Sequence, residues 1–137
     1  MGLDDGRIQG FLATKEIAVL ATVQADGGPL AMPMWFLHAP SALTMISVAD
    51  TQKVRNLRRD ARVSVVAEAV SGSGEVRGVT LQGRAEFLSD GPERRALIER
   101  FHAKYRGLER LWGGQAMPAN RVMFSVVPSR VRSWGLG

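Results

Sequence analysis

The sequence contains no cysteine, which excludes disulfide bonds, thiolate metal sites and a cysteine nucleophile. It also lacks any apolar run near the roughly 18–20 residues that a membrane-spanning helix needs, and segment 1–10 is too polar for an export signal. The two histidines, His38 and His102, have no companions at metal-ligand spacing. We therefore expect a soluble, cytoplasmic protein without a metal, whose redox chemistry would require a bound organic cofactor.

The net charge of +5 favours an anionic partner, because clustered Lys and Arg side chains concentrate phosphates and carboxylates nearby. Composition alone leaves nucleic acid, an acidic membrane surface and a phosphorylated small molecule open. A barrel that binds nucleic acid would interleave aromatic with basic residues on an exposed sheet. The basic cluster of this chain falls on a helix without stacking partners, so we expect a small molecule and neither nucleic acid nor membrane.

The length of 137 residues and a hydrophobic fraction of 45% suffice for one core, so we expect a single domain over 1–137. Short β-branched or alternating runs, bounded by Gly, Pro and Asp, predict strands over 17–23, 29–37, 43–48, 62–67, 76–88 and 121–127, the last continuing over 130–134. Helices are predicted over 52–59 and after 90–93, while 108–119 looks irregular. This pattern indicates a mainly β fold with two or three helices, a six-stranded closed or partly closed barrel in which meander pairing is the simplest topology.

The most informative stretch is 47–60, where a strand end, a helix N-terminus and a cationic cluster follow one another. Asp50 or Thr51 can cap the helix, and the free N–H groups of its first turn favour an anion. Lys53 and Arg55 can add charge-assisted hydrogen bonds. The stretch predicts a phosphate site, against the simpler interpretation of a solvated helix face.

These residues also resemble a known family. The resemblance is carried by the run from Lys53 to Asp60 with the following Arg62-Val63, by Ala21-Thr22-Val23 and the Asp26-Gly27 hairpin, and by Gly83-Arg84-Ala85. Together they are similar to the pyridoxamine 5'-phosphate oxidase-like FMN-binding split barrels over about residues 11–134. Within that superfamily the chain is most similar to the branch of flavin- and deazaflavin-dependent (F420) oxidoreductases.

The resemblance implies a homodimer with two cofactors in the grooves between its barrels. Lys53, Arg55 and Asn56 would hold the phosphoryl or ribityl end of the cofactor, and Trp134 would close over it from the partner subunit. The ring site would be formed by residues of the second and third strands, namely Met34, Trp35, Phe36, Ile46, Ser47 and Val48.

FMN and coenzyme F420 are both used in this superfamily, and Arg58 and Arg59 favour F420 because its oligoglutamate tail carries more carboxylates. Hydride transfer takes place on the cofactor ring, so no catalytic side chain is assigned. We expect an F420- or FMN-dependent oxidoreductase acting on a small organic substrate. The alternative is a non-catalytic protein that binds a cofactor or haem in the same groove. For Trp112, a cover over the substrate and a surface aromatic packed on the long helix are both open.

Overall fold

The strands follow from the alternation of their side chains. In β1 (Ile17–Val23), Ala18, Leu20 and Thr22 are buried, whereas the residues between them are exposed or half-buried. A period of two is typical of a strand with one face on a core. The computed structural model describes residues 2–137. Its other strands are β2 (Pro29–His38), β3 (Leu43–Val48), β4 (Arg62–Val70), β5 (Val76–Phe87) and β6 (Arg121–Trp134).

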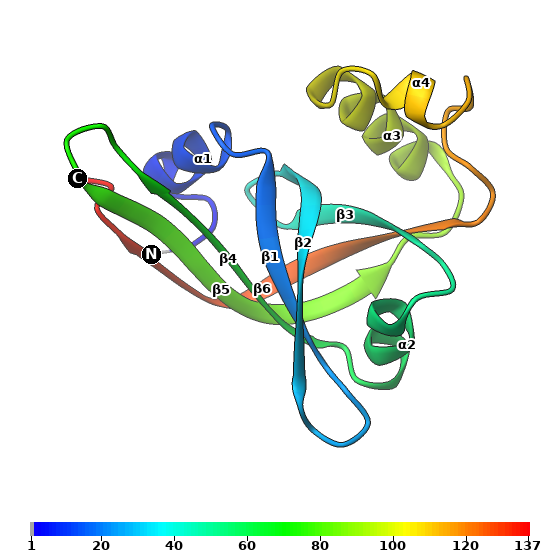
Figure 1. Ribbon diagram of the computed structural model, residues 1–137, viewed down its shortest axis with the longest axis horizontal. Helices are drawn as coiled ribbons and strands as arrows, with labels where there is room; N and C mark the ends of the chain where they lie inside the picture. The colour runs from blue at the N-terminus through cyan, green and yellow to red at the C-terminus, as the bar shows by residue number, and fades with distance from the viewer. Residues whose placement is uncertain (1) are drawn as a thin grey trace.

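The six strands close into a barrel in the order β1-β2-β3-β6-β5-β4, with every pair antiparallel (Figure 1). The predicted split-barrel fold class is confirmed, but the predicted meander is wrong. Helix α2 (Gln52–Arg59) carries the chain away after β3, so β4 returns beside β1 and leaves the edge of β3 to β6. Closure in this order gives each of the six strands two neighbours, although β2 pairs with β3 only over residues 36–38.

Residues 2–137 form four helices rather than the two or three that were predicted. Helices α2 and α3 (Pro92–Lys104) were expected, whereas α1 (Gly6–Leu12) and α4 (Leu108–Leu111) were not. The side chain of Asp5 caps α1 by accepting the N–H of Arg7 at 2.8 Å, and Ile8, Phe11 and Leu12 are buried. Helix α4 is too short to show a periodic pattern. No helix in this part of the chain is long and apolar enough to cross a membrane.

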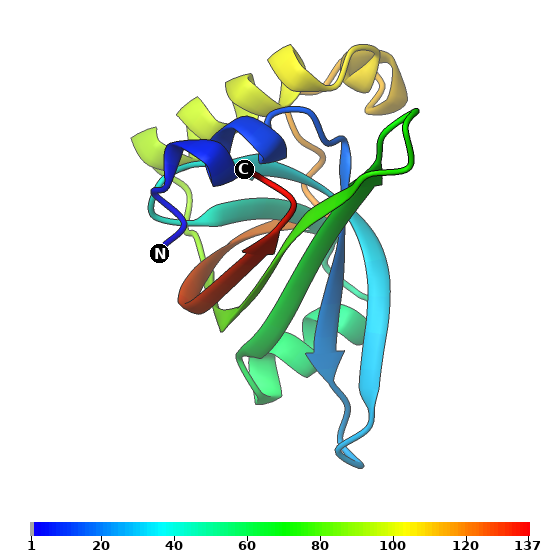
Figure 2. The ribbon, with the colours of Figure 1, turned by 90° about the vertical axis from the view of Figure 1, so that its left-hand side faces the viewer.

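Two groups of buried side chains hold the elements together. One fills the barrel, where Phe36, Met45 and Phe124 have no exposed surface. The other packs α3 and α4 against the outside of the barrel and consists of Leu37, Ile98, Phe101, Tyr105, Leu108, Trp112 and Met123. Figure 2 shows α1 and α3 at one end of the barrel and α2 at the opposite end. The second group therefore fixes α4 beside β2 and β3.

Strand β6 is one continuous strand through Pro128, as the pattern over 121–134 suggested. Its pairing with β5 shifts register between Gln82 and Gly83, where the two backbones approach closely. A Cβ on Gly83 would overlap the Val127 carbonyl group, so only glycine fits this position. The bulge bends β6 and separates its N-terminal half, beside β3, from its C-terminal end at Trp134.

Candidate functional site

A groove of about 300 Å³ lies between the sheet and the helices α3 and α4. Its sheet wall comes from β2 and β3 and consists of Pro33, Met34, Trp35, Ile46, Ser47 and Val48. Its helix wall consists of Phe101, Leu108, Leu111 and Trp112. Both walls are mostly apolar, and Trp35 is 43% exposed, so its indole is accessible to a ligand. The groove suits a planar apolar body.

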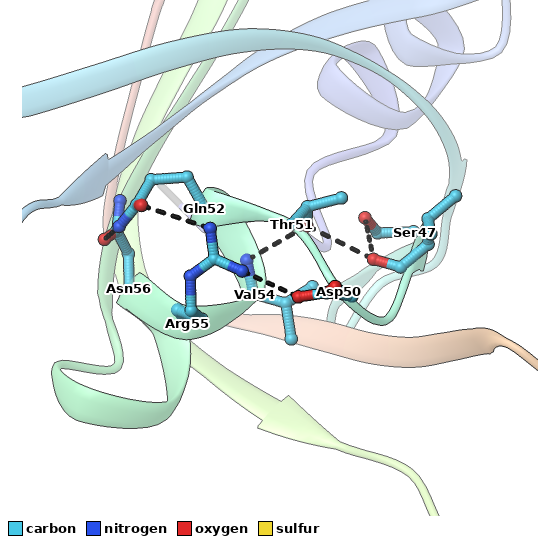
Figure 3. Close-up of polar contacts among 8 residues, drawn as sticks. Ser47, Asp50, Thr51, Gln52, Val54, Arg55 and Asn56 are labelled. Atoms are coloured by element: carbon cyan, nitrogen blue, oxygen red, sulfur yellow. Dashed lines mark hydrogen bonds and ion pairs between the residues drawn. The ribbon is translucent and has the colours of Figure 1, made fainter.

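Helix α2 brings Lys53 to one end of the groove. Thr51 caps the helix by accepting the N–H of Val54 at 3.4 Å, and it donates its own hydroxyl to the Val48 carbonyl at 3.2 Å (Figure 3). Val54 and Leu57 are buried and orient the helix against the barrel. Lys53 is consequently turned to the end of the groove at which β3 finishes.

The Lys53 ammonium is half-buried, and no group among residues 2–137 forms a hydrogen bond or ion pair with it. Burial lowers the pKa of Lys53 below its usual value of 10.5, because the charged form has lost part of its water. An anion placed beside it would reverse this effect. Among residues 2–137 the Lys53 ammonium therefore has no carboxylate partner, and its N–H groups can donate to an anion.

Arg121 is a second cation in the groove, and the sequence did not point to it. It begins β6 and pairs in register with Val48, the last residue of β3. Among residues 2–137 its guanidinium donates only to the neighbouring side chain of Asn120. The pairing of β3 with β6 brings Arg121 to the same end of the groove as Lys53. A correct prediction of strand order would have identified it.

Six of the predicted site residues lie together in the groove: Met34, Trp35, Ile46, Ser47, Val48 and Lys53. Their contributions differ. Met34 and Ser47 are 5% and 4% exposed, and the Ser47 hydroxyl donates to the Val48 carbonyl at 3.1 Å. Trp35 and Val48 are much more exposed. The accessible part of the sheet wall is therefore formed mainly by Pro33, Trp35 and Val48.

Two predicted residues are completely buried and lie outside the groove. The Phe36 ring is in the core of the barrel, because β2 alternates and Trp35 takes the outward position. The Asn56 amide donates to the Thr22 hydroxyl at 3.0 Å, and its oxygen accepts from Gln52 at 2.8 Å. The bond to Thr22 holds α2 against β1, and the bond from Gln52 lies within α2, so both polar ends of Asn56 have partners inside the chain.

The remaining predicted residues also lie outside the groove. Arg55 forms an exposed ion pair with Asp50 at 2.8 Å (Figure 3). Arg59 donates to the carbonyl group of Val23. Trp134 packs on Gly78 near the C-terminus, at the opposite end of β6 from Arg121 (Figure 1). Within one chain, Lys53 and Arg121 are the only cations that line the described groove.

The sequence analysis predicted no residue of the helix wall as a site residue, and it left two interpretations of Trp112 open. Trp112 is 8% exposed, packs with the α3 side chains and also lines the groove, so its packing on the long helix is confirmed and its role as a cover over a substrate stays a prediction. The His102 ring stands edge-on to the Trp112 ring at 5.5 Å and bonds to the Ala116 carbonyl at 2.7 Å. Leu111 is 68% exposed at the rim. The signal for this wall lies in contacts between elements rather than in local sequence.

A larger hollow of about 690 Å³ lies on the outside of β1, β4 and β5 and includes Arg62 and Arg84. It contains none of the predicted site residues and no aromatic side chain. Arg62 is already paired with Asp60 at 2.7 Å. Size alone does not make this hollow the better site, because it offers no surface on which a ring would stack.

A family model described as pyridoxamine 5'-phosphate oxidase matches residues 5–135. The chain belongs to the pyridoxamine 5'-phosphate oxidase family. The matched residues include β2, β3, α2 and the helix wall, so every residue that lines the groove lies within the part of the chain that matches the family model.

Solved structures agree with this assignment of the fold. A conserved hypothetical protein of Mycobacterium tuberculosis is 29% identical with a TM-score of 0.83, over 96% of this chain and 84% of that chain. An FAD-binding protein of Mesorhizobium loti is 20% identical with a TM-score of 0.74, over 89% and 85% of the two chains. HutZ, the haem storage protein of Vibrio cholerae, is 17% identical with a TM-score of 0.76, over 96% and 94%. At identities of 20% and 17% the last two show the shared fold alone.

The groove of this pyridoxamine 5'-phosphate oxidase family member fits a ligand with a planar apolar body and an anionic end. The aromatic and aliphatic walls match the body, and Lys53 and Arg121 match the charge. A flavin phosphate has this division of properties. No carboxylate lines the described groove to repel such a ligand.

Proposed function

We propose that this protein is an oxidoreductase that uses FMN or coenzyme F420 and acts on a small organic substrate. The observation that carries the proposal is the half-buried, unpaired ammonium of Lys53 at one end of an apolar groove. In an anion site such a group forms charge-assisted hydrogen bonds worth about 1.5–3 kcal/mol. Structural similarity to an FAD-binding protein also supports a flavin-type ligand.

Lys53 and Arg121 would hold the phosphate, and Trp35 with Val48 would support one face of the ring. Phe101, Leu111 and Trp112 would face the ring from the helix wall and keep water away from it. A bound flavin or deazaflavin supplies hydride transfer at its ring. The chain contributes binding, orientation and an apolar environment, which agrees with the lack of an acid–base pair in the groove.

The choice between the two cofactors rests on fewer residues than the sequence suggested. Arg58 packs over the Phe87 ring at 4.1 Å, and Arg59 donates to the Val23 carbonyl group. Arg59 therefore has a partner within the chain, whereas the stacking of Arg58 leaves its N–H groups available to a carboxylate. We keep FMN and F420 as equal candidates.

Titration of the purified protein with FMN and with F420, followed by absorbance and fluorescence, tests the proposal. We expect one of them to bind with a spectral shift, and K53A to weaken that binding. Turnover of the reduced cofactor with quinones or other conjugated acceptors then tests the oxidoreductase activity. Absence of binding by both cofactors would overturn the proposal.

The second candidate is a protein that carries haem or stores a cofactor without turnover. Structural similarity to HutZ favours it. Neither histidine lines the groove, since His38 bonds to Gln9 at 2.7 Å and His102 bonds to the Ala116 carbonyl. Haem would therefore lack a histidine axial ligand in the groove of one chain. A haem titration that gives a histidine-ligated spectrum would favour this candidate over the flavin.

We further propose that the protein is a homodimer. The outer face of β1 and β4 exposes Ile17, Val19 and Val66, and Val19 pairs with Val66 across the two strands. A sheet face with several exposed branched side chains is typical of a surface covered by a partner. Sedimentation should give a dimer for the natural chain and a monomer for V19E. A natural chain that sediments as a monomer with bound cofactor would contradict this proposal.

A further inference from the structure

The ladder between β1 and β2 ends beside the groove in an unusual way. The last pair of the ladder is Ile17 with Trp35, so the next pair in the same register would be Glu16 with Phe36. That pair does not form, because the pairing of β2 with β1 ends at Ile17 and Trp35, whereas on its other side β2 pairs with β3 from Phe36 onward. The backbone groups of Glu16 and Phe36 that would have bonded to each other need another partner.

The hydroxyl of Tyr105 supplies that partner. It accepts the N–H of Phe36 at 2.8 Å and donates to the carbonyl group of Glu16 at 2.7 Å. The hydroxyl thus bridges the two residues that would have formed the next pair of the ladder. Tyr105 is 6% exposed, so water does not compete for these bonds.

The ring of Tyr105 lies against the residue before this bridge. It stacks on the Trp35 indole with the ring centroids 4.5 Å apart and the planes within 5° of parallel. Trp35 lines the groove, and Phe101 of the helix wall lies 6.1 Å from Tyr105 between ring centroids. The Tyr105 side chain is therefore both hydrogen-bonded to the backbone of β2 and stacked on the Trp35 indole, which projects from the same strand.

The protonation of Tyr105 and the neighbouring Lys104 both strengthen the contacts between α3 and β2. Burial raises the pKa of Tyr105 to about 12, so the hydroxyl remains a hydrogen-bond donor at neutral pH. Lys104 donates to the Phe36 carbonyl at 2.7 Å, and its ammonium lies 3.8 Å from the centroid of the Phe36 ring. The C-terminal turn of α3 therefore holds the strand on which Trp35 is placed.

We propose that Tyr105 is a positioning residue that sets the plane of the Trp35 indole in the groove and thereby the affinity for a planar ligand. The inference rests on the proposed function for the identity of that ligand. The indole is 43% exposed, so without the stacked ring it could rotate about its side-chain bonds. The two hydrogen bonds of the hydroxyl hold the Tyr105 ring in place. The stacked Tyr105 ring then restricts rotation of the Trp35 indole.

The test is a double-mutant cycle with Y105F, W35L and the double variant, read out as the dissociation constant for FMN or F420. Y105F keeps the ring but removes the bridge, and we expect affinity to fall by roughly 3- to 10-fold. W35L should weaken binding by a similar factor. If Tyr105 acts through Trp35, the double variant binds no more weakly than W35L. Independent, multiplicative losses would overturn the inference.

A matched control separates positioning from general loss of stability. T44V also removes a buried hydroxyl, whose partner is Ser125 at 3.4 Å, but Thr44 does not line the groove. T44V should lower the midpoint of urea unfolding without changing cofactor affinity. If T44V weakens cofactor binding as much as Y105F does, the effect of Y105F is one of stability and the inference is wrong.

A second readout does not depend on the proposed function. The near-ultraviolet circular dichroism of the natural chain minus that of W35L reports the environment of the Trp35 indole. The same difference taken in the Y105F background should be clearly smaller, because the indole has lost its fixed neighbour. Equal differences in the two backgrounds would overturn the inference. Failure of the natural chain to bind FMN and F420 would instead overturn the proposed function and leave this spectroscopic test intact.

Discussion

The side-chain amide of Asn56 donates to the hydroxyl of Thr22 at 3.0 Å, and this bond joins α2 to β1 inside the protein. Asn56 has no exposed surface and Thr22 has 1%. The helix that carries Lys53 is therefore fastened to the barrel by a buried polar contact as well as by Val54 and Leu57. The position of the cation in the groove depends on this fastening.

We predict that N56A lowers the free energy of unfolding by about 1–3 kcal/mol, because the Thr22 hydroxyl loses a buried partner. Urea unfolding measures this loss. R55A, on the exposed side of the same helix, is the control and should stay within about 0.5 kcal/mol of the natural chain. If Asn56 acted only on the ligand, N56A would unfold at the same urea concentration as the natural chain.

Lys53 and Arg55 should differ in their effect on cofactor affinity. K53A should weaken binding by roughly 10- to 100-fold, because it removes a charge-assisted bond from a half-buried site. R55A should weaken it much less, since Arg55 is exposed and already paired with Asp50. Fluorescence titration measures the cofactor affinity of both variants. Equal losses of affinity in K53A and R55A would place the phosphate on the outer side of α2.

The apolar rim of the groove can be tested at Leu111. L111S should weaken cofactor binding by roughly 2- to 10-fold, because the apolar area that this side chain buries against the ligand is lost. Leu111 is 68% exposed, so the free energy of unfolding should hardly change. V70S is the matched control, since Val70 is 64% exposed and lies outside the groove. Equal affinities for L111S and V70S would remove Leu111 from the site.

Lys104 should make stability depend on pH. Burial lowers its pKa from 10.5 to about 8, so between these values the unfolded chain binds more protons than the folded one. The free energy of unfolding therefore rises with pH through this window, and the cost of burying the charge is fully present below pH 8. Urea unfolding between about pH 7 and 9 measures the rise below the usual pKa of Tyr105, 10.0, at which Tyr105 of the unfolded chain titrates.

K104M should reduce this rise. K15M is its control, because Lys15 is also a half-buried lysine that donates to a backbone carbonyl group, that of Glu68 at 2.7 Å. Parallel pH profiles for the natural chain and K104M would show that the Lys104 ammonium is not the group responsible.

The close approach at Gly83 predicts a destabilised bulge in G83A. The added methyl group would overlap the Val127 carbonyl group, and we expect a loss of about 1–3 kcal/mol in the free energy of unfolding. G72A is the control, because a Cβ at Gly72 meets nothing within 4 Å. Thermal unfolding of the two variants should separate clearly, and similar midpoints would contradict the bulge geometry.

Local patterns in the sequence predict the six strands, the helix α2 and the position of Lys53 at the start of that helix. These features depend on neighbours within a few residues: alternation in β1, the Thr51 cap, and the spacing of Val54 and Leu57. Because each of these patterns involves only residues that are close in the sequence, they can be recognised without a structure.

The order of the strands could not be predicted from local patterns, and the groove depends on that order. The pairing of β3 with β6 brings Arg121 beside Val48, and the packing of α3 brings Phe101 and Tyr105 beside Trp35. These partners are separated by tens of residues, and burial of common apolar surface selects them rather than local propensity. Phe36 and Trp35 show the same limit of local patterns. Successive side chains of a strand point to opposite faces, so the sequence predicts that one of the two is buried. The structure shows that Phe36 is in the core and that Trp35 lines the groove.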